Sequence, residues 1–75
     1  MNASGLGRIT FEPGKMGGRA CIRGLRITVA QLLSRVAEGA TTEQLLIEYP
    51  DLQPEDIRQA LTYAAWLAGD RVITA

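Results

Sequence analysis

Four basic side chains lie along one glycine-rich stretch, and their type is suited to contacts with phosphate or carboxylate groups. They are Lys15, Arg19, Arg23 and Arg26. The only acid among residues 8–29 is Glu12. Charge-assisted hydrogen bonds from such cations bind nucleic-acid phosphates or an acidic protein. Alternatively, the four are solvated on a hairpin whose glycines supply left-handed backbone angles. The sequence leaves both interpretations open.

The order of residues in this stretch excludes a nucleotide-binding P-loop. Such a loop requires a lysine followed by Ser or Thr at the start of a helix, so that backbone amides and the hydroxyl hold phosphate and magnesium. Here Lys15 is followed by Met16, and no helix is expected to begin there. A phosphate contact that does not read sequence remains compatible with the charges.

No group of residues in this chain is typical of an active site or a metal centre. The chain has no histidine and one cysteine, Cys21, so the usual zinc sites and a histidine-activated thiol are excluded. We interpret Cys21 as a small buried apolar residue. The carboxylates are spread along expected helix surfaces rather than gathered at one point. We therefore expect no enzymatic activity, no cofactor and no metal.

Charge is divided between the two halves of a neutral chain. Residues 1–35 carry six bases and one acid, whereas residues 36–75 carry two bases and seven acids, which gives net charges of +5 and −5. Either the halves neutralise each other within the fold or across a dimer, or they present a charged surface to a partner.

The length of 75 residues predicts one small domain that buries only about 60% of its unfolded surface, so we expect a homodimer. No export signal or membrane span is apparent, and we expect a cytoplasmic protein.

The basic stretch is expected to form a β-hairpin behind a flexible leader at residues 1–7. Alternating apolar residues predict strands at 8–11 and 25–29, which pair antiparallel through a long glycine-rich loop. Arg26 lies between two apolar residues of the second strand, and we expect it to pair with a helix carboxylate.

Three helices are predicted to follow the hairpin. The first covers residues 29–38, with Thr28 as its cap and Gly39 as its end. The second starts after Thr41 or Thr42 and ends near residue 48, where a Tyr-Pro step follows. The third covers residues 54–68, with a proline in its first turn. The sequence therefore predicts a mostly α fold, in which a short β-hairpin precedes a three-helix, helix-turn-helix-like domain over residues 8–75.

The third helix carries two kinds of candidate contact residue. Arg58 and Gln59 could read DNA bases, although acids in the same turn would repel phosphates. Tyr63 and Trp66 are expected away from the core, where they would form a dimer or partner interface, unless residues 72–74 cover them. The stripe expected to be buried comprises Ile57, Ala60, Leu61, Ala64 and Ala68.

Several linked motifs resemble those of a small prokaryotic family, domain of unknown function 433. They are GGRACIRGLRITV at 17–29, YPDL at 49–52 and IRQALTYA at 57–64. The chain departs from the typical pattern at Ala20, where proline is usual, and at Leu25, where threonine is usual. The first departure concerns local loop rigidity and the second a hydroxyl contact.

The resemblance implies a dimeric antitoxin of a type II toxin-antitoxin pair, which neutralises a PIN-like ribonuclease. The toxin contact would come from the basic loop residues, and Tyr63 with Trp66 would form the dimer or partner interface. An alternative is a repressor that binds operator DNA of its own operon through Arg58 and Gln59. A third interpretation is a dimerisation module without a ligand.

Overall fold

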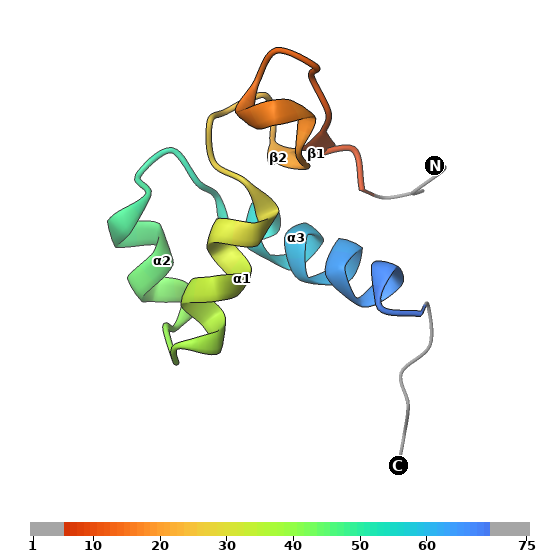
Figure 1. Ribbon diagram of the computed structural model, residues 1–75. Coiled ribbons are helices and arrows are strands. Elements are labelled where there is room, and N and C mark those ends of the chain that lie inside the picture. The colour runs from red at the N-terminus through yellow and green to blue at the C-terminus, as the bar shows by residue number, and fades with distance from the viewer. Residues whose placement is uncertain (1–5, 70–75) are drawn as a thin grey trace.

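The computed structural model describes residues 6–69, which form a short hairpin followed by three helices (Figure 1). The elements are β1 (Ile9–Thr10), the 3-10 turn η1 (Met16–Gly18), β2 (Cys21–Ile22), α1 (Val29–Ala37), α2 (Thr42–Glu48) and α3 (Pro54–Leu67). The predicted mostly α fold with an N-terminal antiparallel hairpin is confirmed. None of the three described helices combines the length and the apolar composition that a membrane span needs.

The second strand of the hairpin differs from the prediction. β1 pairs antiparallel with β2, so that Ile9 lies opposite Ile22 and Thr10 lies opposite Cys21. The sequence placed Cys21 and Ile22 in the connecting loop and predicted the strand at 25–29, which is wrong. The hairpin is therefore shorter than expected, and its loop is closed before the first helix begins.

A tight turn directly after β2 explains this difference. Arg23 and Gly24 both have left-handed backbone angles, with φ of +46° and +72°, and the Leu25 amide donates to the Ile22 carbonyl at 2.7 Å. Two consecutive residues of this kind are typical of a type I′ turn, which joins neighbouring strands. The chain then returns along the other edge of β2, where the Ile22 amide donates to the Ile27 carbonyl at 3.0 Å.

Two threonines begin the first two helices as predicted. The Thr28 hydroxyl accepts from the Gln31 amide at 3.0 Å, and the Gln31 side chain accepts from the Thr28 amide at 2.8 Å. Thr41 and Gln44 form the same reciprocal pair, with distances of 3.1 and 2.8 Å. Thr41, the first of the two candidate caps, is therefore the one used. Gly39 follows α1 with a φ of +98°, which confirms its role as the helix end.

The core joins the hairpin to all three helices. Both α1 and α2 pack against α3, and the hairpin lies over the first turns of α3 (Figure 1). Leu6, which the sequence assigned to a flexible leader, is buried in this core. Ile47 on α2 is 78% exposed. The buried core residues are Leu6, Ile9, Ile22, Val29, Leu32, Leu45, Leu52, Ile57, Ala60 and Tyr63.

The buried face of α3 is rotated from the predicted one. Ile57 and Ala60 are buried as expected, but Leu61 is 41% exposed and Ala68 is exposed, so the prediction is wrong for these two. The face that meets the hairpin instead carries two buried polar residues, Asp56 and Gln59, together with Tyr63. The spacing of apolar residues could not predict this face, because polar residues bury the first turns of α3.

Candidate functional site

The five basic residues of the hairpin region fall into two groups. Arg8, Lys15 and Arg23 bind carboxylates within the fold. Arg19 and Arg26 are exposed, and neither forms an ion pair within residues 6–69. The expected pairing of Arg26 with a helix carboxylate is therefore wrong, because the turn after β2 replaces the predicted strand and leaves this side chain exposed.

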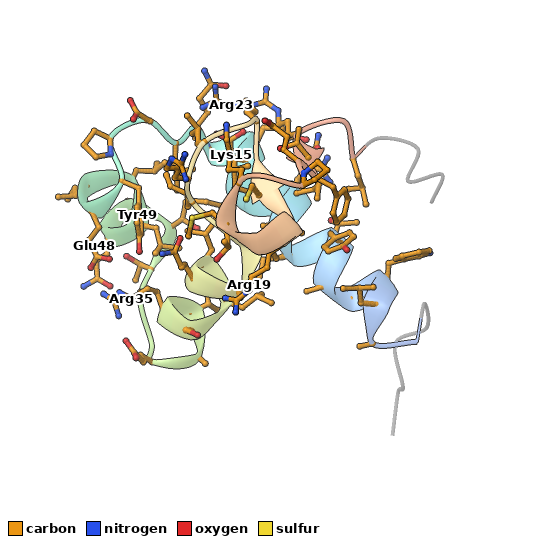
Figure 2. The ribbon with its side chains drawn as sticks, turned by 45° about the horizontal axis from the view of Figure 1, so that its top comes forward. Lys15, Arg19, Arg23, Arg35, Glu48 and Tyr49 are labelled. Carbon is orange, nitrogen blue, oxygen red and sulfur yellow. The ribbon has the colours of Figure 1, made fainter. Side chains whose placement is uncertain are left out.

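Lys15 closes the loop of the hairpin. Its ammonium group donates to the Gly24 carbonyl and lies 3.4 Å from a carboxylate oxygen of Glu12. Figure 2 shows Lys15 and Arg23 on the same side of the hairpin, whereas Arg19 lies beside α1. The geometry gives Lys15 an internal structural contact, so the residues of the predicted basic contact set do not form one continuous exposed patch.

Arg8 and Arg23 converge on a single buried carboxylate, that of Asp56 in the first turn of α3. Oδ1 accepts from Arg8 Nη1 at 2.7 Å and from Arg23 Nε at 3.0 Å. Oδ2 accepts from Arg23 Nη2 at 3.0 Å and from the Gln53 amide at 2.8 Å. We call Arg8, Arg23, Gln53 and Asp56 the Asp56 cluster. It ties both strands of the hairpin region to the start of α3.

The charge of Asp56 is retained despite its burial. Burial by itself would raise the pKa of Asp56, but the hydrogen bonds from Arg23, Arg8 and the Gln53 amide outweigh it, and the pKa is lowered from its ordinary value. In turn, the hydrogen bond to Asp56 raises the pKa of Arg23. The sequence pattern indicated that Asp56 lies on a helix surface and did not reveal this cluster. Its one available signal was an acid three residues after Gln53, where a helix-capping carboxylate is favoured.

The two residues considered for DNA contact both bind Glu55 of α3. Arg58 Nε donates to Glu55 at 2.8 Å and remains exposed. Gln59 is buried, accepts from the Arg8 amide at 3.0 Å and donates to Glu55 at 3.1 Å. The hydrogen bonds from Arg58 and Gln59 lower the pKa of Glu55 to about 2. The structure therefore does not present Gln59 to a DNA groove, and it places an ionised acid beside Arg58.

The aromatic residues of α3 are not equivalent. Tyr63 is buried, which contradicts its predicted place away from the core, because the rotated face of α3 turns it toward the hairpin. It contacts Phe11 edge to face, with ring centroids 5.9 Å apart, and stacks on Trp66 at 6.2 Å. Trp66 is 41% exposed, which agrees with its predicted place away from the core. Residues 72–74, which were considered as a cover for Trp66, lie outside the described residues.

An apolar groove lies between the hairpin, α1 and α3. Its volume is about 290 Å³, and it is open to solvent. Apart from Arg19 and the aromatic Tyr63, its lining residues are aliphatic. We call it the Arg19 groove, and its lining residues are Arg19, Ala20, Val29, Ala30, Leu33, Tyr63 and Leu67.

Ion pairs also join the basic half of the chain to its acidic half. Arg35 on α1 donates to Glu48 on α2 at 2.9 Å and to Glu38 at 2.7 Å, and Figure 2 shows Arg35 beside Glu48. These contacts raise the pKa of Arg35 and lower that of Glu48. With the Asp56 cluster, they show that much of the charge asymmetry is neutralised inside the fold. Among residues 6–69, no three His, Cys, Asp or Glu side chains gather closely enough to hold a metal ion.

Comparisons with known proteins match most of this chain. The sequence profile of a family described as "Protein of unknown function (DUF433)" matches residues 9–64. An "Uncharacterized protein y4eO" from Sinorhizobium fredii is 38% identical over 56 residues, which are 75% of this chain and 25% of that protein. This chain thus spans a quarter of the length of that relative.

A solved structure shares the fold described above. The crystal structure of a DUF433 member protein from Anabaena variabilis superposes with a TM-score of 0.73 and 37% sequence identity, covering 83% of this chain and 59% of that chain. The matched residues 9–64 include the hairpin and the Asp56 cluster except Arg8.

Proposed function

The chain belongs to the DUF433 family of proteins of unknown function, and on that premise we propose that it is a non-enzymatic antitoxin that binds and neutralises a PIN-like ribonuclease. The resemblance of its motifs to family members regarded as partners of such nucleases supports the choice of partner. In this proposal the protein acts in the cytoplasm as a homodimer.

The observation that carries the proposal is the pair of exposed arginines without an internal partner. Arg19 and Arg26 have no ion pair within the described residues, although the other three basic residues of this region do. The active site of a nuclease of this class is rich in carboxylates that bind metal ions. Guanidinium groups form strong hydrogen bonds with carboxylates and steer association with an acidic partner.

The bound basic residues serve this function indirectly. Arg8 and Arg23 fix the hairpin to α3, and Lys15 closes the loop that leads to Arg19. A loop that is ordered before binding loses less conformational entropy when it meets a partner. The Asp56 cluster therefore supports the presentation of Arg19 and Arg26 without contacting the nuclease itself.

The exposed apolar end of α3 supports the homodimer in this proposal. Leu61 and Trp66 are each 41% exposed, and no charged residue occurs from residue 59 to residue 69. Large exposed apolar and aromatic side chains are typical of interfaces. The alternative of a DNA-binding repressor has less support, because Gln59 is buried and Arg58 is paired with Glu55.

Co-expression with the nuclease encoded beside this protein tests the proposal. We expect the unaltered chain to restore growth and the double variant Arg19→Ala/Arg26→Ala to fail. The control is Arg58→Ala, which removes an exposed arginine that is already paired and should still restore growth. Arg23 is left unchanged, because its loss would unfold the hairpin rather than test the contact. Full rescue by the double variant would remove these two arginines from the function.

Rescue also has to be traced to binding. Calorimetric titration of the purified nuclease should give a measurable affinity for the unaltered chain and for Arg58→Ala, and a strongly reduced one for the double variant. If the unaltered chain neither binds the nuclease nor restores growth, the proposed function is wrong.

A further inference from the structure

The lining of the Arg19 groove combines apolar side chains with one arginine that forms no ion pair within residues 6–69. Resting on the proposed function, we propose that this groove receives an apolar side chain of the partner nuclease, and that Arg19 binds a carboxylate on the same partner segment. The occupant is thus an acidic segment with an apolar anchor residue. Recognition of this kind pairs a buried anchor with a charge at the rim.

The residues that line the groove favour an acidic segment with an apolar anchor residue. Val29, Leu33 and Leu67 offer aliphatic surface on two helices, and no acidic residue lines the groove. An apolar side chain placed there removes this surface from water. The Arg19 guanidinium forms no ion pair within residues 6–69, so it is available for a carboxylate brought in beside the anchor residue.

The groove has room for an anchoring side chain. Its volume of about 290 Å³ lies at the lower end of the range of roughly 300–1,000 Å³ that is usual for small-molecule sites. Its walls come from the hairpin, α1 and α3, whose relative positions are fixed by the core and by the Asp56 cluster. The groove is therefore present before any partner arrives, which lowers the entropic cost of binding.

Charge complementarity favours the nuclease over a second copy of this chain. The adjoining end of α3 has no charged residue between residues 59 and 69. If a second copy placed its own uncharged end of α3 in the groove, Arg19 would meet no carboxylate from those residues. An acidic partner segment supplies the carboxylate that a second copy lacks there.

Two variants that place a carboxylate in the groove test this inference. Ala30→Glu changes an exposed position on α1, and Leu67→Glu changes a residue that is 61% exposed on α3. Each new carboxylate would compete for Arg19 and would place a charge in the apolar groove. The matched control is Ile47→Glu, the same type of change at a residue that is 78% exposed on α2 and does not line the groove.

The measurement is calorimetric titration of each full-length variant with the purified nuclease, after circular dichroism has verified that each variant melts like the unaltered chain. We expect Ala30→Glu and Leu67→Glu each to weaken binding at least tenfold, and Ile47→Glu to bind within twofold of the unaltered chain. Comparable affinity for both groove variants, together with weak binding by Arg19→Ala/Arg26→Ala, would overturn the groove inference and leave the proposed function in place.

Two further outcomes are also decisive. If the unaltered chain does not bind the nuclease, the proposed function itself is wrong and this inference falls with it. If sedimentation shows that Leu67→Glu converts a dimer to a monomer while its affinity for the nuclease is unchanged, the groove is occupied by a second copy, and the inference is overturned.

Discussion

The guanidinium of Arg23 contacts the carboxylate of Asp56 through three hydrogen bonds of 3.0 to 3.2 Å, although the two residues lie 33 positions apart. The carboxylate is fully buried, whereas Arg23 reaches it from the exposed turn after β2. Removing one partner of a buried ion pair is strongly destabilising, because the other charge is left buried without a partner. Replacing both partners by apolar residues has a much smaller effect on stability. This contact therefore makes the position of the hairpin depend on one acid of α3.

Asp56→Ala is expected to lower the free energy of unfolding by about 3 kcal/mol, because it leaves two arginines without their shared carboxylate and the Gln53 amide without its acceptor. Urea unfolding followed by circular dichroism measures the change. The control is Asp51→Ala, which removes a nearby exposed carboxylate and should change the free energy by less than about 0.5 kcal/mol. Equal losses in the two variants would contradict a specific role for Asp56.

Acid should destabilise the protein through the same carboxylate. Because hydrogen bonds from the two arginines and Gln53 outweigh burial and lower the pKa of Asp56 from its ordinary value of 3.8, the folded state releases its proton more readily than the unfolded state. This contribution to stability is present above the ordinary pKa and is lost as the pH falls below about 4 toward the lower folded value. The midpoint of thermal unfolding should therefore be nearly constant from about pH 7 to 5 and should fall below that range.

Measurements in high salt distinguish the contribution of Asp56 to the acid dependence of stability from the contributions of the surface ion pairs. Glu48 and Glu55 also have lowered pKa values, owing to Arg35 and Arg58 respectively, but these pairs are exposed and are screened by added salt. The acid dependence that persists in high salt should disappear in Asp56→Asn. If that variant keeps the full dependence in high salt, another group is responsible.

Gly24→Ala should destabilise the hairpin. Gly24 has a φ of +72°, and an added Cβ would lie 3.1 Å from a carboxylate oxygen of Glu12. A residue other than glycine costs about 1 kcal/mol in this backbone region. Gly14→Ala is the matched control, since a Cβ there meets nothing within 4 Å. Urea unfolding should show a loss of about 1 kcal/mol for the first variant only, and a loss of the same size at Gly14 would argue against the turn geometry.

The cap of α2 can be tested with two neighbouring threonines. Thr41→Ala removes the hydroxyl that accepts from the Gln44 amide at 3.1 Å, and it should cost about 1 kcal/mol of stability. Thr42→Ala changes an exposed residue inside the first turn and should have little effect. Thermal melts of the two variants provide the comparison, and a larger loss at Thr42 would contradict the assigned cap.

The three helices could be predicted because their signals are local. Thr28, Gly39 and Thr41 lie where caps and helix ends are favoured, and the structure uses each of them as expected. The pairing of the hairpin could not be predicted in this way. Alternating residues at 25–29 resemble a strand, whereas the turn that decides the pairing depends on left-handed angles at Arg23, which is not a glycine.

The candidate site was only partly predictable for a related reason. The basic residues are evident in the sequence, but which of them are bound depends on a carboxylate far along the chain. Asp56 looks like an ordinary first-turn acid, and only the fold brings Arg8 and Arg23 onto it. The hairpin covers Asp56 and also Gln59, which accepts from the Arg8 amide. The buried face of α3 is therefore rotated from the predicted one, and Tyr63 lies in the core.

The contacts of Arg8 set an order of events during translation. Its amide and side chain bond to Gln59, Asp56 and Gln53, which follow it by 51, 48 and 45 positions. On the ribosome the hairpin emerges first, while the residues that fix it have not yet been synthesised. The hairpin and its arginines therefore reach their final arrangement only after α3 has left the exit tunnel, so a truncated nascent chain lacks the ordered loop of the finished protein.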